Sequence, residues 1–302
     1  MALGYDRKLY VLAFDHRGSF QKKMFGIAGD PDAEESARIS DAKSVIFDGF
    51  NRALAEGAPK DAAGVLVDEQ FGADIARKAR ADGCVLAMPV EKSGQDEFDF
   101  EYGDDFGRHI EEFDPSFSKV LVRYNPDGDA AMNARQSERL LRLSDWLHEQ
   151  DRKFLFELLV PAEPHQLESV GGDADRYDSE VRPGLMLRTI AALQEAGIEP
   201  DIWKIEGIDR REDCEAIAAQ VRSGGRDGVG CVVLGRGANA EKVEHWLRQG
   251  AGVPGYLGFA IGRTIWWDAL AGYLDGSVSR DEATATISAN YRRNIEVYES
   301  AS

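Results

Sequence analysis

The sequence is short of cysteine and of long apolar runs, and both shortages narrow the class of protein. Its 302 residues include three cysteines, Cys84, Cys214 and Cys231, with no CxxC pair. So sparse and odd a set favours neither a disulfide framework nor a zinc site, and it fits a reducing cytoplasm. The N-terminus lacks a signal-peptide core, and no run approaches the roughly 18 apolar residues of a membrane helix. We therefore expect a cytoplasmic protein that does not enter a membrane.

Positive charge is also scarce, which limits the expected partners. Lysine and arginine number 36 against 54 acidic residues, a net charge of -18. So acidic a surface repels nucleic acid and anionic lipid, and we expect neither as a partner. No P-loop and no GxGxxG motif follows the first predicted strand, so ATP and NAD are not expected. The five histidines show no HxxxH or HxH spacing, which disfavours a metal-dependent mechanism, and we predict no metal and no other cofactor.

Short apolar runs alternate with helical patterns along the chain. Predicted strands cover 9–14, 64–67, 84–88, 118–124, 154–159, 201–205, 230–234 and 256–261. Helical spacing covers 35–56, 72–82, 133–150, 184–196, 211–222 and 239–249. This alternation predicts a (β/α)₈ TIM barrel as a single domain over 1–302, with 281–301 as an extra C-terminal helix. An open, doubly wound sheet is the alternative. The long non-periodic stretch 89–104 is typical of a functional or mobile loop.

Ionisable residues gather where the predicted strands end, which is the catalytic end of such barrels. Any one of them could be solvated or could form a structural salt bridge. Six strands delivering charge to one end is costly, however, unless the charges bind or catalyse. Of these residues we expect five to bind substrate: Arg17, Asp68, Lys119, Arg123 and Glu206.

Lys204 is the most informative of these charges, because it stands in the middle of the apolar strand "PDIWKIEG" (200–207). An inward position near Lys119 and Arg123 would favour the neutral amine, a nucleophile that forms a Schiff base with a carbonyl. Glu157 and Asp15 are placed to act as acid or base. The alternative is a plain ion pair of Lys204 with Glu157 or Glu206.

Two Gly-Arg pairs follow the last two predicted strands, in "LGRGAN" (234–239) and "AIGRTIWW" (260–267). Glycine lets a phosphate approach the backbone, arginine binds its oxygens, and a helix N-terminus adds donors. The loops after strands 7 and 8 are the usual phosphate site of TIM barrels. We therefore predict that a phosphate binds at Gly235, Arg236, Gly237, Gly262 and Arg263. The alternative is turn glycines beside surface arginines.

Several of these stretches together resemble one family over roughly residues 8–298. The stretches are "LAFDHRGSF" (12–20), "VDEQFG" (67–72), "PVEKSGQDEFDFEYG" (89–103), "KVLVRYNPDGD" (119–129), "WKIEG" (203–207) and "GRGA" (235–238). The sequence resembles the 2-deoxy-5-keto-D-gluconate 6-phosphate aldolase-like domain of myo-inositol catabolism. That domain is often fused behind 5-dehydro-2-deoxygluconokinase, and no kinase domain is seen here.

A more distant similarity is to class I tagatose 1,6-bisphosphate and sulfofructose-phosphate aldolases. It implies Lys204 as the Schiff-base lysine, Glu157 as proton shuttle, Asp15 as a hydroxyl or acid/base contact, and Lys119 as a site cation. The chain departs from these relatives at Arg123, where they tend to have tyrosine, and at Glu206-Gly207, where they have Glu-Val-Pro.

The function expected from these observations is a class I aldolase that splits 2-deoxy-5-keto-D-gluconate 6-phosphate into dihydroxyacetone phosphate and malonate semialdehyde. The partner is thus a phosphorylated keto-sugar or keto-sugar acid, and we expect a homo-oligomer. Two alternatives stay open. One is the same chemistry on another ketose phosphate, and the other is a non-catalytic sugar-phosphate-binding module that acts with a kinase.

Overall fold

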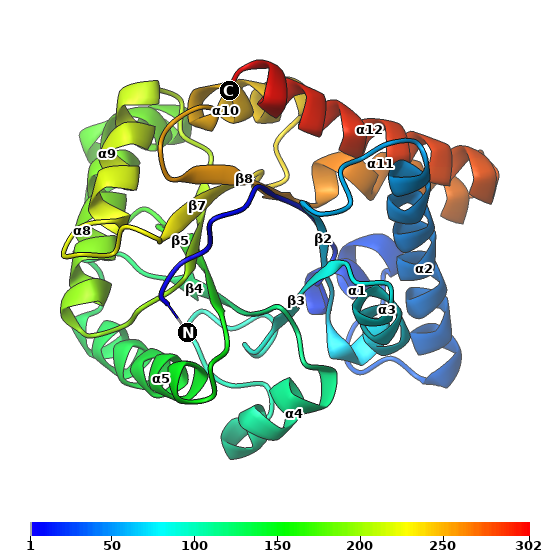
Figure 1. Ribbon diagram of the computed structural model, residues 1–302, viewed down its shortest axis with the longest axis horizontal. Coiled ribbons are helices and arrows are strands. Elements are labelled where there is room, and N and C mark those ends of the chain that lie inside the picture. The colour runs from blue at the N-terminus through cyan, green and yellow to red at the C-terminus, as the bar shows by residue number, and fades with distance from the viewer. Residues whose placement is uncertain (1) are drawn as a thin grey trace.

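The computed structural model describes residues 2–302, which form a closed parallel barrel surrounded by helices (Figure 1). The strands follow one another around the barrel in chain order, and β8 closes it by pairing with β1. This confirms the predicted (β/α)₈ barrel and excludes the open sheet. The strands, each within one residue of its predicted bounds, are β1 (Leu9–Ala13), β2 (Ala63–Leu66), β3 (Val85–Pro89), β4 (Phe117–Arg123), β5 (Phe154–Leu159), β6 (Ile202–Glu206), β7 (Gly230–Leu234) and β8 (Tyr256–Ile261).

The helical segments confirm each predicted helix to within three residues and add shorter ones. The predicted helices are α2 (Ala33–Ala55), α3 (Glu69–Ala81), α5 (Ala130–Glu149), α8 (Arg182–Glu195), α9 (Arg211–Val221), α10 (Ala240–Gly250) and the extra C-terminal α12 (Arg280–Ser300). The others are α1 (Gly18–Phe25), η1 (Gly103–Asp105), α4 (Phe106–Phe113), α6 (Pro164–Ser169), α7 (Ala174–Arg176), the π-turn η2 (Tyr177–Val181) and α11 (Arg263–Leu274). None of the helices in residues 2–302 is long and apolar enough to cross a membrane.

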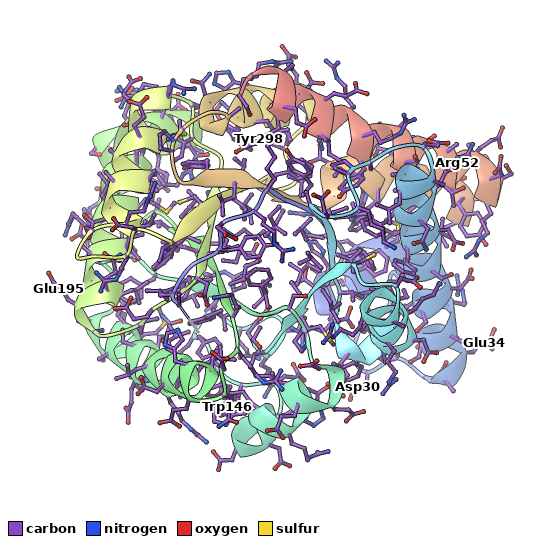
Figure 2. All side chains as sticks on the ribbon, viewed as in Figure 1. Asp30, Glu34, Arg52, Trp146, Glu195 and Tyr298 are labelled. Atoms are coloured by element: carbon purple, nitrogen blue, oxygen red, sulfur yellow. The ribbon has the colours of Figure 1, made fainter. Side chains whose placement is uncertain are left out.

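Alternation along the strands divides the core into two parts. One set of side chains fills the barrel: Leu9, Val11, Ala13, Leu66, Ala87, Phe117, Leu155, Ile202, Val232 and Ala260. The other, larger set lies between the barrel and its helices and includes Leu12, Val120, Phe156 and Trp203. Charged residues such as Glu34 and Glu195 lie at the outer edge of the helical ring (Figure 2). A strand residue that shares the parity of the inner set therefore points into the barrel.

The C-terminal helix α12 is fixed to α2 by close contact. A methyl group on Gly49 of α2 would lie 2.6 Å from Ile287 of α12, so the two helices touch there without a side chain between them. Side-chain capping boxes start both helices, Asp32 with Glu35 in α2 and Ser279 with Glu282 in α12. Tyr291 of α12 also donates a hydrogen bond to the carbonyl of Tyr10 in β1, 2.6 Å. Helix α12 therefore packs over the outer side of the barrel at β1.

The stretch 89–104, predicted as a functional or mobile loop, folds back over the end of β3. Glu91 pairs with Phe100 in an antiparallel bridge, and Phe98 and Phe100 are buried. The amide of Phe98 donates to Gln136 of α5, 2.8 Å, and the carboxylate of Glu97 accepts from Arg139, 2.6 Å. The loop is thus anchored to α5, which holds Glu91 at the barrel mouth.

Candidate active site

The strand register brings the central charges into one layer at the carboxyl ends of the strands. Glu157 of β5 is the register partner of Lys204 on β6, and on β4 the partner of Glu157 is Leu121. Lys119, Glu157 and Lys204 share the parity of inner-core residues on their own strands. Their side chains therefore point into the barrel, just above its apolar filling.

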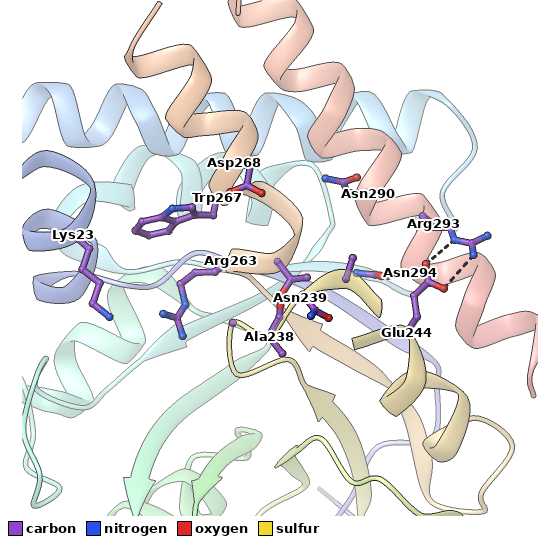
Figure 3. Close-up of a pocket in the computed structure, with 13 residues that line it drawn as sticks. Lys23, Ala238, Asn239, Glu244, Arg263, Trp267, Asp268, Asn290, Arg293 and Asn294 are labelled. Carbon is purple, nitrogen blue, oxygen red and sulfur yellow. Dashed lines mark hydrogen bonds and ion pairs between the residues drawn. The ribbon is translucent and has the colours of Figure 1, made fainter. Parts of the chain in front are cut away.

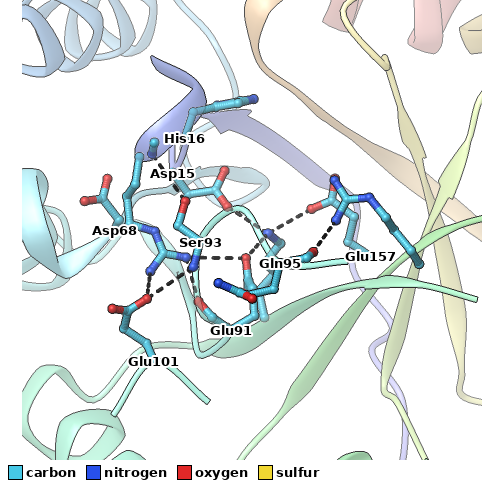
Figure 4. A network of polar contacts seen from close by, with 12 residues as sticks. Asp15, His16, Asp68, Glu91, Ser93, Gln95, Glu101 and Glu157 are labelled. Atoms are coloured by element: carbon cyan, nitrogen blue, oxygen red, sulfur yellow. Dashed lines mark hydrogen bonds and ion pairs between the residues drawn. The ribbon is translucent and has the colours of Figure 1, made fainter. Parts of the chain in front are cut away.

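Lys119 lies at the centre of a ring of carboxylates. Its Nζ atom is 2.8 Å from Asp15 Oδ2, 2.7 Å from Glu91 Oε1 and 3.0 Å from Glu157 Oε2. Figure 4 shows these carboxylates converging from three different segments. Burial alone would lower the pKa of Lys119, but the three anions outweigh it and raise that pKa. Lys119 is thus a fixed cation.

Lys204 forms an ion pair with Glu157 Oε2, the same oxygen that contacts Lys119. Its Nζ atom lies 3.0 Å from Glu157 Oε2, and the residue is 3% exposed. The alternative expectation of a Lys204–Glu157 ion pair is therefore confirmed. Lys204 does lie near Lys119, and the carboxylate of Glu157, expected to act as acid or base, stands between the two ammonium groups.

The carboxylates of the site remain ionised because of these two lysines. Burial by itself would raise the pKa of Asp15, but Lys119, His16 and Lys204 lower it well below its usual range. The pKa of Glu157 is likewise lowered, since Lys119 and Lys204 outweigh the effect of burial. Both groups can therefore accept a proton from a bound reactant.

Glu91 and His16 behave differently from these two carboxylates. Burial raises the pKa of Glu91, even though Lys119 and Arg17 oppose it. Burial also lowers the pKa of His16 to about 4, with help from Arg263, Lys204 and Lys43 against the pull of Asp15. His16 is thus a neutral imidazole at pH 7. Its ring meets Trp266 edge to face at 5.8 Å.

Lys204 and Glu157 line two adjoining cavities. The larger, of about 650 Å³, extends toward β7, β8 and η2, and is lined by Arg123, Glu206, Arg236 and Arg263 among others. The smaller, of about 170 Å³, extends toward the 91–98 loop and holds Asp15, Arg17, Glu91 and Lys119. Ala13 and Ala260 line the larger cavity, and their small side chains leave space opposite the lysine.

All five residues predicted to bind phosphate lie at one end of the larger cavity. Gly262 caps α11, and Arg263 is the first residue of that helix. The guanidinium of Arg263 packs over Gly237 and donates to the carbonyl of Arg236, 3.0 Å. Gly237 has φ +74°, a conformation that favours glycine. This end of the cavity thus combines backbone donors with the guanidinium groups of Arg236 and Arg263 and with the N-terminus of α11.

Asp68 is the predicted substrate-binding residue that the structure does not bring to either cavity. It is fully buried, accepts from the amide of Phe71 at the start of α3, 2.9 Å, and pairs with Lys43 of α2. Lys43 also donates to the carbonyls of Phe14, 2.8 Å, and His16, 3.0 Å. Asp68 is therefore a support for the end of β1, and the expectation that it contacts substrate does not fit its position.

The other predicted substrate-binding residues line the cavities, held by neighbouring groups. Arg17 donates to Glu101, 2.8 Å, and to the carbonyl of Glu91, 2.6 Å. Arg123 lines both cavities and donates to the carbonyl of Gln95, 2.8 Å. Glu206 lies 3.1 Å from Arg236 Nε. Burial raises the pKa of Glu206 despite Arg182 and Arg236.

Three site residues escaped the sequence-based selection. Glu91 shares the parity of the inner residue Ala87, so its position after the third strand carried a usable signal. Lys43 interrupts the apolar face of α2 between Ile39 and Phe47, which marks a buried charge. The role of His16 had no clear signal, because its burial depends on Trp266 far along the chain.

Among residues 2–302, no group of three or more His, Cys, Asp or Glu side chains is arranged to hold a metal ion. Asp15, Glu91 and Glu157 converge on the ammonium of Lys119, which occupies the position that a metal ion would need.

A family model described as "Uncharacterized protein conserved in bacteria (DUF2090)" matches residues 4–302. A search of curated protein sequences gives no match. Among solved structures, a fructose-bisphosphate aldolase from Plasmodium falciparum has a TM-score of 0.68 at 14% identity, covering 97% of this chain and 91% of that one. An archaeal fructose 1,6-bisphosphate aldolase has a TM-score of 0.59 at 14% identity, covering 97% and 94%. A Schiff base-forming fructose-1,6-bisphosphate aldolase has a TM-score of 0.57 at 16% identity, covering 95% and 94%. At these identities the likeness shows a shared fold.

Proposed function

The chain belongs to the DUF2090 family, and we propose that it is a class I aldolase whose Schiff base forms on Lys204. One observation carries the proposal: a buried lysine faces a cavity of about 650 Å³ and forms an ion pair with a buried carboxylate, 3.0 Å away. The fold shared with a Schiff base-forming aldolase supports the same chemistry.

The first half of the reaction uses the Lys204–Glu157 pair. Transfer of a proton from Lys204 to Glu157 leaves a neutral amine, which attacks the ketone carbon of the substrate. A new C–N bond forms, the carbonyl oxygen takes a proton, and loss of water gives the iminium. Lys119 stays charged throughout, because Asp15 and Glu91 hold its remaining protons in place.

The second half breaks the carbon–carbon bond. A carboxylate, Glu157 or Asp15, removes the proton of the hydroxyl that lies β to the iminium carbon. The C–C electron pair moves into the iminium, which gives an enamine on Lys204 and a free aldehyde. Protonation of the enamine carbon and hydrolysis then release the second product and restore the amine.

The phosphate end of the larger cavity would orient the substrate. Arg236, Arg263 and the start of α11 provide donors for a phosphate there. A ketone adjacent to the phosphorylated carbon would then be held over Lys204, which reduces the entropic cost of the attack.

The substrate that the sequence favours is 2-deoxy-5-keto-D-gluconate 6-phosphate, cleaved to dihydroxyacetone phosphate and malonate semialdehyde. Its support is the resemblance of "PVEKSGQDEFDFEYG", a stretch that places Glu91 against Lys119. A second candidate is another ketose phosphate, favoured by the fructose-bisphosphate aldolases among the similar structures.

The test is reductive trapping. Dihydroxyacetone phosphate with borohydride should add the mass of the reduced ketone to Lys204, located by peptide mass spectrometry. Lys204→Ala should give no adduct, whereas Lys92→Ala, which removes an exposed lysine of the smaller cavity, should still give one. Phosphosugar binding without any adduct would favour the non-catalytic module instead. Turnover rates over a panel of ketose phosphates would then select the substrate.

A further inference from the structure

A third cavity, of about 550 Å³, lies on the outer side of the loops after β7 and β8. Its walls come from α1, the start of α10, α11 and the middle of α12 (Figure 3). It shares Lys23, Gly237 and Arg263 with the larger cavity of the candidate active site. Arg263 therefore stands between two spaces, only one of which contains Lys204.

The wall formed by α12 presents an unpaired buried amide. Asn294 is 6% exposed, and among residues 2–302 its side chain has no hydrogen-bond partner. Figure 3 shows it reaching from α12 toward the start of α10. Asn290, one turn earlier, is by contrast satisfied by the carbonyl of Ile265, 2.9 Å. The amide has no partner within the described part of the protein and lines the cavity, so it is free to bind a polar group there.

The opposite wall supplies uncompensated positive charge. Lys23 has no ion-pair partner in the part of the chain that the structure describes, and Arg263 uses one N–H on the carbonyl of Arg236. Glu244, by contrast, is neutralised by Arg293 at 2.9 and 3.2 Å (Figure 3). The exposed carboxylate of Asp268 remains as a hydrogen-bond acceptor. An anion therefore fits beside Lys23 and Arg263, and hydroxyl groups fit further along.

We propose that this cavity is a second binding site for a sugar phosphate, separate from the catalytic one. The phosphate binds between Lys23 and Arg263, and the hydroxyl groups bind to Asn294 and Asp268. The indole of Trp267, which lines the cavity between these groups, contacts the C–H face of the sugar. The proposal does not depend on Lys204 acting as a nucleophile.

Sharing two cations makes the two sites antagonistic. A phosphate in the outer cavity draws Lys23 and Arg263 away from a phosphate in the inner one, and the reverse follows by reciprocity. The expected consequence is inhibition by a phosphosugar that the enzyme does not cleave.

Calorimetric titration with glucose 6-phosphate, which needs no turnover, tests the site. The wild-type chain should show a binding event at the outer cavity, and Asn294→Leu should weaken that event at least tenfold. Thr286→Val, on the same helix outside the cavity, should leave glucose 6-phosphate binding unchanged. Lys204→Ala should retain the Asn294-dependent event, so the result stands apart from that of the trapping experiment.

Two further measurements keep the test decisive. If Asn294→Leu melts early, the isosteric Asn294→Asp places a negative charge beside the sugar and should weaken the same event. Unphosphorylated glucose should bind at least tenfold more weakly than glucose 6-phosphate. If no glucose 6-phosphate binding event is weakened by either Asn294 variant, the proposal is overturned, whether the wild type shows one event or two.

Discussion

The Nζ atom of Lys204 lies 3.0 Å from Glu157 Oε2. The same oxygen is 3.0 Å from Lys119 Nζ, so one carboxylate oxygen joins two buried ammonium groups. The two lysines are not equivalent. Lys119 has three carboxylate partners, whereas Lys204 has one within the described chain and faces the larger cavity. This asymmetry is why the proposed Schiff base is assigned to Lys204, the lysine that faces the larger cavity.

Replacing Glu157 by glutamine should slow the chemistry far more than it weakens binding. The amide cannot take the Lys204 proton, so kcat should fall by about 10²–10⁴-fold. Borohydride trapping should slow in parallel, because the neutral amine forms less often. Steady-state kinetics checks the first effect and timed mass spectrometry the second. Glu149→Gln, at the exposed end of α5, is the control, and equal rates in the two variants would contradict the role of Glu157.

The fold could be predicted from the sequence because its signal is local. Strands β5, β7 and β8 have the bounds that their apolar runs indicate, and their alternation with amphipathic helices leaves few topologies. Short elements such as α6 and η2 escaped prediction, because residues 164–181 carry no long apolar period. Their positions depend on tertiary contacts, such as the hydrogen bond from Tyr177 to the carbonyl of Val160, 2.8 Å.

The candidate site was predictable where strand parity alone decides orientation, as for Lys119, Glu157 and Lys204. Asp68 shows the limit of that reasoning. It follows its strand with inward parity, yet its carboxylate turns to cap α3 and to pair with Lys43. A buried cation on a distant helix competes for the same carboxylate, and spacing along one strand gives no sign of it.

Replacing Lys119 by methionine should destabilise the fold in a pH-dependent manner. Asp15, Glu91 and Glu157 would then lie together without their shared cation, which costs about 3–5 kcal/mol at pH 7.5. Their pKa values would rise above those of the unfolded chain, so the folded variant would bind protons more strongly. The difference in free energy of unfolding between the variant and the wild type should therefore shrink as pH falls from 7.5 to 5.

Urea unfolding at several pH values measures this deficit. The exposed Lys78→Met, which removes only a surface pair with Asp82, should cost under about 1 kcal/mol at every pH. A deficit in Lys119→Met that stays constant with pH would show that the carboxylates are not coupled to this lysine.

His16 should make the protein less stable in mild acid. Burial, with the nearby cations, lowers its pKa to about 4, while an unfolded histidine titrates near 6.5. Between these values the unfolded chain binds a proton that the native chain does not, so stability present at pH 7 is lost as pH falls. Because the ring is only partly shielded from water, we expect a loss of about 2 kcal/mol.

The variant His16→Gln should remove this part of the pH dependence. Urea unfolding at pH 7.0, 6.0, 5.0 and 4.5 compares it with wild type, and the exposed His148→Gln serves as control. Titration of Glu91 and Glu206 is present in all three proteins, so it cancels in the differences. Parallel stability curves for wild type and His16→Gln would refute the assignment.

Gly262 should be irreplaceable at the start of α11. A methyl group there would lie 2.3 Å from the carbonyl oxygen of Ala13, a backbone atom that cannot move aside cheaply. Gly262→Ala should therefore cost about 1–3 kcal/mol, displace Arg263, and raise KM for a phosphorylated substrate more than it lowers kcat.

Gly184→Ala in α8 is the matched control, because nothing lies within 4 Å of its added methyl. Thermal melting and steady-state kinetics should separate the two variants, with Gly184→Ala within about 1 kcal/mol of the wild type. If Gly262→Ala also keeps wild-type stability and KM, the close approach of α11 to β1 is not what positions the phosphate end.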